Sequence, residues 1–332
     1  MGHFIQFAIN GVMAGAIYAL IALGIVAVYK ATRVVNFAHG YVIMIGAYLY
    51  YTFAVLLPSA PWFPDLLFTP AWLLEAKSKA PIFSQEATLL SWLEKLPRIT
   101  FGLISAILAA AVLARFIERF LMRPLLGQSN FSMIMVTVGL ISVLSGLKSM
   151  IWTGDAASVP HLSPNPAIRF ELFGSPIFIF GSNLASTAIS VLIFCAIVTW
   201  LRRSAKGIAI RATSEDQSTA YSMGISVPGV FANAWMLAAA TGAIAGAILA
   251  ARDGVSPALG LFGFSVLAIV LMGGLDSFVG VFISAMTVGI LEAMAQWKLG
   301  GEWAEIIPYV TVLIVILFRP HGLFGQKEVE RI

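Results

Sequence analysis

Hydrophobic residues form long runs along this chain, and short polar segments separate them. A helix needs about 20 apolar residues to span the hydrocarbon core of a bilayer. The run at 262–272 is too short to cross alone, so it either extends through 255–261 or is re-entrant. The pattern predicts an all-α integral membrane protein, a polytopic bundle of eight or nine transmembrane helices with interrupted helices among them. The runs are Phe4–Tyr29, Phe37–Leu57, Ile99–Ala114, Phe131–Trp152, Leu184–Leu201, Val230–Ala251, Phe262–Met272, Phe278–Ala295 and Trp303–Phe318.

Composition supports one membrane domain over residues 1–332. Hydrophobic residues make up 59% of the chain and charged residues only 11%, whereas soluble domains carry about 25% charged residues.

Cys195 is the single cysteine, so no intramolecular disulfide can form. No Walker-type phosphate loop occurs, and the four histidines are scattered, so neither ATP binding through such a loop nor a metal site is expected. The first run lacks a preceding basic segment and is interpreted as a retained span.

Positive charge predicts how the chain is oriented. If the polar segment 202–228 is cytoplasmic, alternation of the spans puts 30–35, 115–128 and 319–332 on the same side. These four segments contain twelve of the 20 Lys and Arg. Most of the others fall in two long segments, where basic residues have little influence on topology. We therefore expect the N-terminus outside and the C-terminus in the cytoplasm.

Two segments are expected outside the membrane as loops. Residues 58–98 begin with a proline cluster and contain three tryptophans, which suit the membrane interface. This loop could be a lid or a docking surface for an external partner. Residues 153–182 are rich in proline and irregular, and a short hairpin is expected around Phe170–Phe178.

The polar segment 202–228 contains the strongest signal of a short helix. Ser214 and Gln217 have the spacing of a capping box, and the two acidic residues between them would fall in the first helical turn. A helix of about nine to ten residues follows, with Ala220 and Met223 on one face and a glycine just past its end. It is either an amphipathic connector or a coupling helix that inserts into a cytoplasmic motor. Candidate coupling residues are Glu215, Asp216, Ala220 and Gly224.

Two polar interruptions occur at comparable places in the two halves of the chain, at 34–40 and 272–277. Each could be a tight glycine turn. Alternatively, a helix that begins inside the membrane would present its N-terminal N–H groups to a polar solute, as in transporters with broken helices. The candidate residues of such a translocation path are Asn36, His39, Gly40, Gly273, Gly274 and Asp276.

Small residues recur at intervals of four in the span 230–251. This spacing lets two helices approach closely. The contact could lie inside the bundle or between two membrane subunits. The residues concerned are Ala239, Ala243, Ala247, Gly242 and Gly246.

Several motifs together resemble the branched-chain amino-acid ABC permeases of the H type, and they cover nearly the whole chain except the longer segment 58–98. They are Ala14–Gly24, Asn36–Gly40, Gly46–Tyr48, Glu118-Arg119, Arg123–Leu125, Gly224-Ile225, Gly242–Gly246, Gly273-Gly274 and Arg319–Gly325.

This resemblance implies the permease subunit of an importer in the bacterial inner membrane, which moves branched-chain or other hydrophobic amino acids by ATP-driven alternating access. It implies four kinds of partner: a second permease of the M type, two ATPase subunits, a periplasmic solute-binding protein and membrane lipid, with no nucleic acid. No cofactor is expected in this chain, since ATP and Mg²⁺ would bind the ATPase subunits. By position, the candidate coupling residues lie in the ATPase-contacting loop, and Asn36 and His39 lie in the family's central break.

Other functions remain open on the sequence. The same architecture could carry urea or a short-chain amide. An ion-coupled secondary transporter would need ionisable groups inside its spans, and the candidates, Lys148 and Glu292, lie near span ends. A membrane enzyme would need clustered nucleophiles or metal ligands, and none occur.

Overall fold

The computed structural model of this chain describes residues 2–60, 85–152, 156–172 and 175–325, and most of them are helical. Within these ranges eight helices are long and apolar enough to cross a membrane, and a ninth apolar helix, Ala258–Gly273, is shorter. The prediction of an all-α polytopic membrane protein with eight or nine helices is therefore confirmed.

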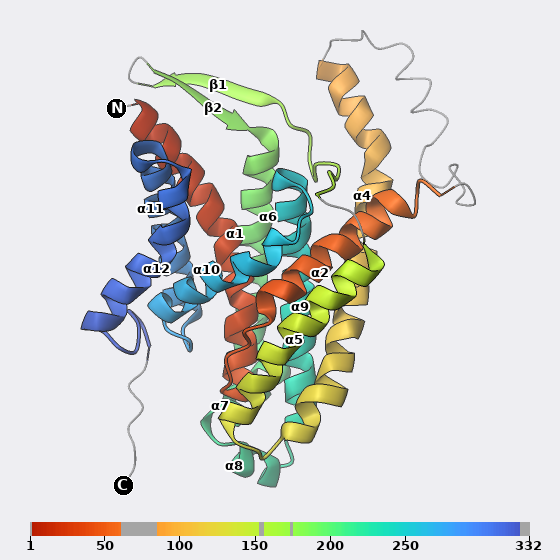
Figure 1. Ribbon diagram of the computed structural model, residues 1–332, viewed down its shortest axis with the longest axis vertical. Helices are drawn as coiled ribbons and strands as arrows, with labels where there is room; N and C mark the ends of the chain where they lie inside the picture. The colour runs from red at the N-terminus through yellow and green to blue at the C-terminus, as the bar shows by residue number, and fades with distance from the viewer. Residues whose placement is uncertain (1, 61–84, 153–155, 173–174, 326–332) are drawn as a thin grey trace.

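The elements follow the predicted runs closely, with one hairpin between them (Figure 1). In chain order they are α1 (Gly2–Thr32), α2 (His39–Tyr51) with the π-helical turn η1 (Thr52–Leu56), α4 (Gln85–Ile117) with η3 (Glu118–Met122) and η4 (Arg123–Leu125), α5 (Asn130–Ile151), β1 (Ala167–Leu172), β2 (Ser175–Phe180), α6 (Gly181–Arg203), α7 (Ala205–Glu215), α8 (Gln217–Ser222), α9 (Val227–Asp253), α10 (Ala258–Gly273), α11 (Phe278–Leu299) and α12 (Gly301–Phe318).

Helices α1 and α9 form the centre of the bundle. In the most apolar 18-residue stretch of each helix, the buried share is 89% for α1 and 78% for α9. The corresponding share is only 22% for α5 and 17% for α12. A helix that is hydrophobic all round must be covered by other helices or by lipid. The outer helices leave large apolar side chains such as Leu192 and Leu313 exposed, which is expected where the surface faces acyl chains.

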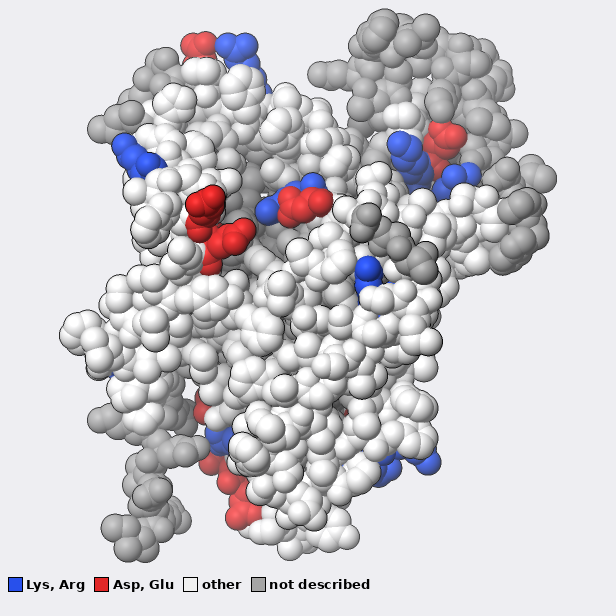
Figure 2. Space-filling model, viewed as in Figure 1, with Lys and Arg blue, Asp and Glu red and all other residues white. Residues whose placement is uncertain are grey.

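Charged side chains gather towards the two ends of the face shown in Figure 2, and a broad band of uncharged residues lies between them. One end holds the N-terminus of α1 and the hairpin, where Gln6 accepts a hydrogen bond from the Phe178 backbone N–H at 2.8 Å. The other end holds α7 and α8 (Figure 1). The predicted hairpin around residues 170–178 is confirmed, and it lies at the end opposite the candidate coupling loop.

The small residues of α9 pack inside this chain. A Cβ on Gly46 of α2 would lie 2.6 Å from the Ala243 Cα, and a Cβ on Gly246 would lie 2.9 Å from the Ala47 nitrogen. Ala243 and Ala247 are fully buried. Of the two alternatives for this pattern, the structure shows contact within the bundle, where small side chains let α2 and α9 approach closely.

Helices α2 and α10 are both short and both run diagonally over the bundle (Figure 1), and their backbones come closest at a crossing point near Gly40 and Gly263. A Cβ added to Gly40 would lie 2.7 Å from the Gly263 Cα. No side chain fits between the two backbones at this crossing. The short run at 262–272 does extend towards its N-terminus, but only from Ala258.

The segment expected as an irregular outer loop is partly helical. Within the predicted loop 58–98, residues 61–84 lie outside the described ranges, but α4 begins at Gln85 and continues through Pro97. Proline removes one backbone hydrogen bond and usually ends a helix. Here the Thr100 hydroxyl donates to the carbonyls of Leu96 and Pro97, both at 3.0 Å. The helix therefore begins before Ile99, where the predicted apolar run starts, and Pro97 lies inside it.

Candidate functional site

Arg33 lies where three separate segments of the chain meet. It follows the last residue of α1 and has φ of +57°, a left-handed conformation that costs a residue with a Cβ roughly 1–2 kcal/mol. Its Nη1 donates to both carboxylate oxygens of Asp276 at 3.2 and 3.1 Å, and its Nε donates to the Ser214 carbonyl at 2.8 Å. Arg33 thus joins the end of α1, the turn between α10 and α11, and the end of α7.

The chain after Arg33 turns back into the bundle before α2 begins. Asn36 accepts a hydrogen bond from the Ala38 N–H at 3.0 Å, and His39 is the first residue of α2. His39 Nε2 lies 3.2 Å from the carbonyl of Ile21, eleven residues before the end of α1, or about 16 Å along the helix. Helix α2 therefore starts about one third of the way along α1 from its C-terminal end, which is the condition for a half-helix N-terminus inside the membrane.

Asn36 and His39 are only 3% and 1% exposed. The void beside them is about 10 Å³, room for at most one water molecule. Trp235 of α9 lines the same void, and its Nε1, like His39 Nδ1, is buried without a hydrogen-bond partner among the described residues. Buried polar atoms are rarely left without partners, so Trp235 is a further candidate for the path, and a tryptophan in a span of small residues was its only sequence signal.

The second break lies at the other end of α10, away from Asn36 and His39. Gly274 has φ of +100° and is packed against Gly325, while the N–H groups of Leu323 and Phe324 donate to the last carbonyls of α10, at 2.8 and 3.2 Å. Ser277, not Asp276, caps α11, because its hydroxyl accepts from the Gly280 N–H at 3.0 Å.

The structure therefore does not gather the six candidate path residues into one place. Asp276 lies beside the coupling segment through Arg33, whereas His39 lies at the depth of Ile21. Gly40 is buried at the crossing with α10, Gly273 packs against Gly280 and Val281 of α11, and Gly274 packs against Gly325. Their roles in translocation stay predictions.

The coupling segment forms two helices where one was expected. Helix α7 begins with Ser204 as its N-cap, and Glu215 is its last residue. Ser214 does not cap a helix, since its hydroxyl donates to the Arg211 carbonyl at 2.8 Å. Asp216 is instead the N-cap of α8 and accepts from the Thr219 N–H at 2.8 Å. The capping box was placed two residues too early, because a carboxylate cap competes with a serine cap at nearly the same position.

Local hydrogen bonds shape both ends of α8. The Thr219 N–H and the Ser218 hydroxyl donate to the Asp216 carboxylate and lower its pKa below its usual value. At the other end Gly224 has φ of +83°, and the N–H groups of Gly224 and Ile225 donate to the carbonyls of Tyr221 and Ala220, both at 3.0 Å. This is the Schellman pattern. The predicted glycine just past the helix end is confirmed.

Side chains on α8 divide between the bundle and the outside. Ala220 is 3% exposed, whereas Tyr221 and Met223 are 71% and 78% exposed. The expectation that Ala220 and Met223 share one face is wrong, because Met223 lies past the last helical residue. Large apolar side chains left exposed on a polar segment are typical of a contact surface for another protein.

A basic groove of about 200 Å³ separates α7 from the nearby ends of α1 and α11. Lys30, Arg202 and Arg211 line it together with Asp276. Arg211 Nη1 donates to the Leu201 carbonyl at 2.8 Å, which holds α7 against the end of α6. Among the described residues no group of three His, Cys, Asp or Glu side chains could hold a metal ion.

The chain is similar in sequence to transport proteins over almost its full length. Residues 7–316 match the sequence model of a family described as the permease component of branched-chain amino acid transport systems. The high-affinity branched-chain amino acid permease protein LivH of Escherichia coli is 27% identical, with 99% of this chain and 98% of the relative covered. The corresponding protein BraD of Pseudomonas aeruginosa is 25% identical, with the same shares covered.

A second group of relatives is similar over a shorter stretch. The permease protein LivM of Salmonella typhimurium is 31% identical over 48% of this chain and 37% of the relative. No solved structure matches the chain.

Proposed function

Because this chain belongs to the family of permease components of branched-chain amino acid transport systems, we propose that it forms part of the membrane path of an ATP-driven importer for branched-chain or other hydrophobic amino acids. Its own contribution is shape and mechanical coupling, without covalent chemistry. ATP and Mg²⁺ bind separate ATPase subunits, and a periplasmic binding protein delivers the solute. The similarity to LivM-type permeases supports a second permease of that type as its membrane partner.

The observation that carries the coupling proposal is the arrangement around α8. This helix lies at one end of the bundle (Figure 1) and presents Tyr221 and Met223 outwards. The segment before it is tied to the spans through Arg33 and Asp276. A subunit that grips α7 and α8 would therefore push directly on the end of α1 and on the turn between α10 and α11.

The positive charge clustered on this end supports an orientation with α7 and α8 in the cytoplasm and the N-terminus outside, in the bacterial inner membrane. Lys30, Arg33, Arg202, Arg203 and Arg211 all lie there. Basic residues near span ends favour the cytoplasmic side. Segment 58–98 and the hairpin then face the periplasm, where the binding protein docks.

The proposal is tested with the complete transporter reconstituted in proteoliposomes, by measuring labelled leucine uptake and ATP hydrolysis together. We expect Glu215→Lys combined with Asp216→Lys to reduce uptake at least tenfold for each ATP hydrolysed, while assembly is retained. A matched control is Glu171→Lys combined with Glu302→Lys, which makes the same charge change at exposed positions at the opposite end. Uptake at the wild-type rate by the first variant would show that this segment does not couple ATP hydrolysis to transport.

The transported solute is tested separately with a panel of labelled compounds. Leucine, isoleucine and valine should be taken up, and urea and acetamide should not. Uptake limited to urea would contradict the amino-acid assignment and leave the coupling proposal intact. Uptake by the purified chain alone, driven by a proton or sodium gradient, would contradict both and restore the ion-coupled alternative.

A further inference from the structure

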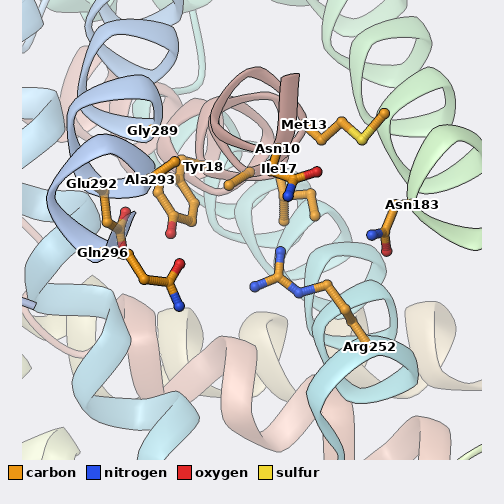
Figure 3. A pocket seen from close by; sticks show the side chains of 11 residues that line it. Asn10, Met13, Ile17, Tyr18, Asn183, Arg252, Gly289, Glu292, Ala293 and Gln296 are labelled. Carbon is orange, nitrogen blue, oxygen red and sulfur yellow. The ribbon is translucent and has the colours of Figure 1, made fainter. Parts of the chain in front are cut away.

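A cavity of about 270 Å³ opens between α1, α6, α9 and α11, at the end of the bundle that carries the N-terminus. None of the candidate coupling or path residues lines it. Figure 3 shows its lining side chains, which come from helices far apart in the sequence and point towards a common space. Its volume is just below the usual range of small-molecule pockets, about 300–1,000 Å³, so it suits a solute of a few non-hydrogen atoms.

One wall of the cavity carries a positive charge with free donors. Arg252, near the end of α9, extends its guanidinium group into the space (Figure 3). Its Nε donates to the Asp253 carboxylate at 3.1 Å. Its two Nη groups have no hydrogen-bond partner in the part of the chain that the structure describes. A guanidinium group with two free terminal nitrogens is suited to bidentate binding of a carboxylate.

The facing wall carries a negative charge. Glu292 of α11 lies beside Tyr18 and Gln296 (Figure 3), and its Oε2 is buried without a hydrogen-bond partner among the described residues. No ion pair joins Glu292 to Arg252 in the described ranges. The Tyr18 hydroxyl forms a hydrogen bond with this carboxylate, but a buried carboxylate oxygen that is left without a partner is costly. Within a cavity that opens to the aqueous end of the bundle, this acceptor is available to a ligand cation.

The remaining surface of the cavity is part polar and part apolar, and Asn10, Asn183 and Gln296 contribute amide groups. Met13 and Ile17, on adjacent turns of α1, are 9% and 3% exposed and line the space together with Ala14 and Ala293. The cavity therefore combines one cationic group, one anionic group and a hydrophobic wall. Polar groups that converge on a concave space can fix the orientation of a small molecule there.

We propose that this cavity binds the transported amino acid before it passes to the centre of the membrane. Arg252 binds the α-carboxylate, Glu292 binds the α-ammonium group, and the apolar side chain lies against Met13 and Ile17. This assignment rests on the proposed function, because it identifies the cavity's ligand with the transported solute. It gives partners to the two Nη groups of Arg252 and to Glu292 Oε2, which have none among the described residues: a zwitterion satisfies both sides of the cavity.

Direct binding tests the site. Tritiated leucine is titrated in a scintillation proximity assay against the purified complex of this chain with its partner permease and ATPase subunits, without binding protein. Each charge-assisted contact contributes enough that Arg252→Gln and Glu292→Gln should each weaken binding about tenfold or more. Glu302→Gln and Lys298→Gln are matched controls at exposed positions near the same end and outside the cavity, and both should bind like the wild type.

Ligand analogues separate the two roles. Leucinamide lacks the carboxylate and isocaproate lacks the ammonium group, so each should compete weakly against labelled leucine in the wild type. The difference in affinity between leucine and leucinamide should be smaller in Arg252→Gln than in Glu292→Gln. The difference in affinity between leucine and isocaproate should be smaller in Glu292→Gln than in Arg252→Gln. Arg252→Lys retains the charge and should bind within a few-fold of the wild type, provided that each variant elutes as an intact complex.

The outcomes distinguish this inference from the proposed function. If the wild type takes up leucine with the binding protein present but the two glutamine variants bind and transport it normally, the cavity is not a solute site and the importer assignment stands. Equal competition by both analogues in every variant would also overturn the inference. Failure of the wild type to take up leucine would defeat the proposed function itself.

Discussion

Arg33 and Asp276 are 243 residues apart in the chain, and their side chains form an ion pair with Nη1 3.1 Å from Oδ2. The same guanidinium group donates to the Ser214 carbonyl at the end of α7. One side chain therefore connects the candidate coupling segment to the turn between α10 and α11. This connection gives the coupling segment a direct mechanical contact with the spans.

Breaking the ion pair should affect coupling more than stability. The two side chains are 30% and 24% exposed, so the pair contributes at most about 1 kcal/mol to the free energy of unfolding. We expect Asp276→Asn to leave the amount of folded complex nearly unchanged and to lower leucine uptake several-fold for each ATP hydrolysed.

A double-mutant cycle with Arg33→Gln, Asp276→Asn and the double variant checks this prediction. If the two residues act through their contact, the double variant should be no worse than the poorer single variant. Fully additive losses in uptake would show that each residue acts independently.

The cap of α8 can be separated from its charge. Asp216→Ala removes the side chain that accepts from the Thr219 N–H, whereas Asp216→Asn keeps a good N-cap without the charge. We expect faster amide hydrogen exchange in α8 only for the alanine variant. If the asparagine variant nevertheless loses coupling, the carboxylate itself contacts the ATPase. Equal exchange in all three proteins would contradict the capping role.

The lowered pKa of Asp216 also predicts the pH dependence of α8. Because the hydrogen bonds from Thr219 and Ser218 favour the carboxylate, the pKa of Asp216 is lower in the folded than in the unfolded chain. Its contribution to stability is complete above the unfolded value of about 3.9 and is lost as pH falls through the folded value. Hydrogen-exchange protection of α8, corrected for intrinsic rates, should be constant between neutral and mildly acidic pH.

Removing the His39 ring should alter transport if the half-helix lines the path. His39 is 1% exposed, so His39→Ala leaves an internal cavity and should cost about 2–4 kcal/mol of stability by analogy with other large-to-small substitutions. Uptake and apparent affinity should both change in complexes that remain intact. Unchanged uptake and affinity would show that His39 does not line the path. The control is Ile43→Ala, a similarly buried position one turn further along α2, which creates a cavity without removing a polar side chain.

The crossing of α2 and α10 should tolerate no added atom. A Cβ on Gly40 would lie 2.7 Å from the Gly263 Cα, so Gly40→Ala should lower stability by about 1–3 kcal/mol through overpacking. Gly139→Ala on α5 is the matched control, because nothing lies within 4 Å of its added Cβ. Thermal unfolding of the purified complex should distinguish the two, and equal melting temperatures would contradict the close contact.

The spans could be predicted because lipid demands long apolar helices whatever their neighbours are. The hairpin near Phe178 and the left-handed Gly224 were also predictable, since turn chemistry acts within a few residues. The start of α4 was not predictable from the apolar run, because the helix extends from Ile99 back to Gln85 through more polar residues and Pro97. Capping at Asp216 was shifted by two residues because adjacent Ser and Asp side chains offer competing local caps.

Contacts between distant segments could not be predicted from one sequence. Arg33 counted only as a basic residue in a turn, and nothing in its neighbourhood indicated Asp276 as its partner. The cavity near the N-terminal end likewise combines Tyr18, Arg252 and Glu292, which meet only when three helices pack. The sequence places Glu292 only as an ionisable residue near a span end, whereas its role as a ligand-binding group depends on Arg252 across the cavity.

The contact between Gly40 and Gly263 has a mechanical consequence. At this contact the two backbones touch directly, and beside it the ring of Tyr41 on α2 lies against Gly260 of α10. A change in the angle between α2 and α10 would therefore pivot on the Gly40–Gly263 contact and move the Tyr41 ring across Gly260. A displacement of Asp276, just beyond the C-terminal end of α10, would then tilt α10 about this contact and move the N-terminus of α2 at His39.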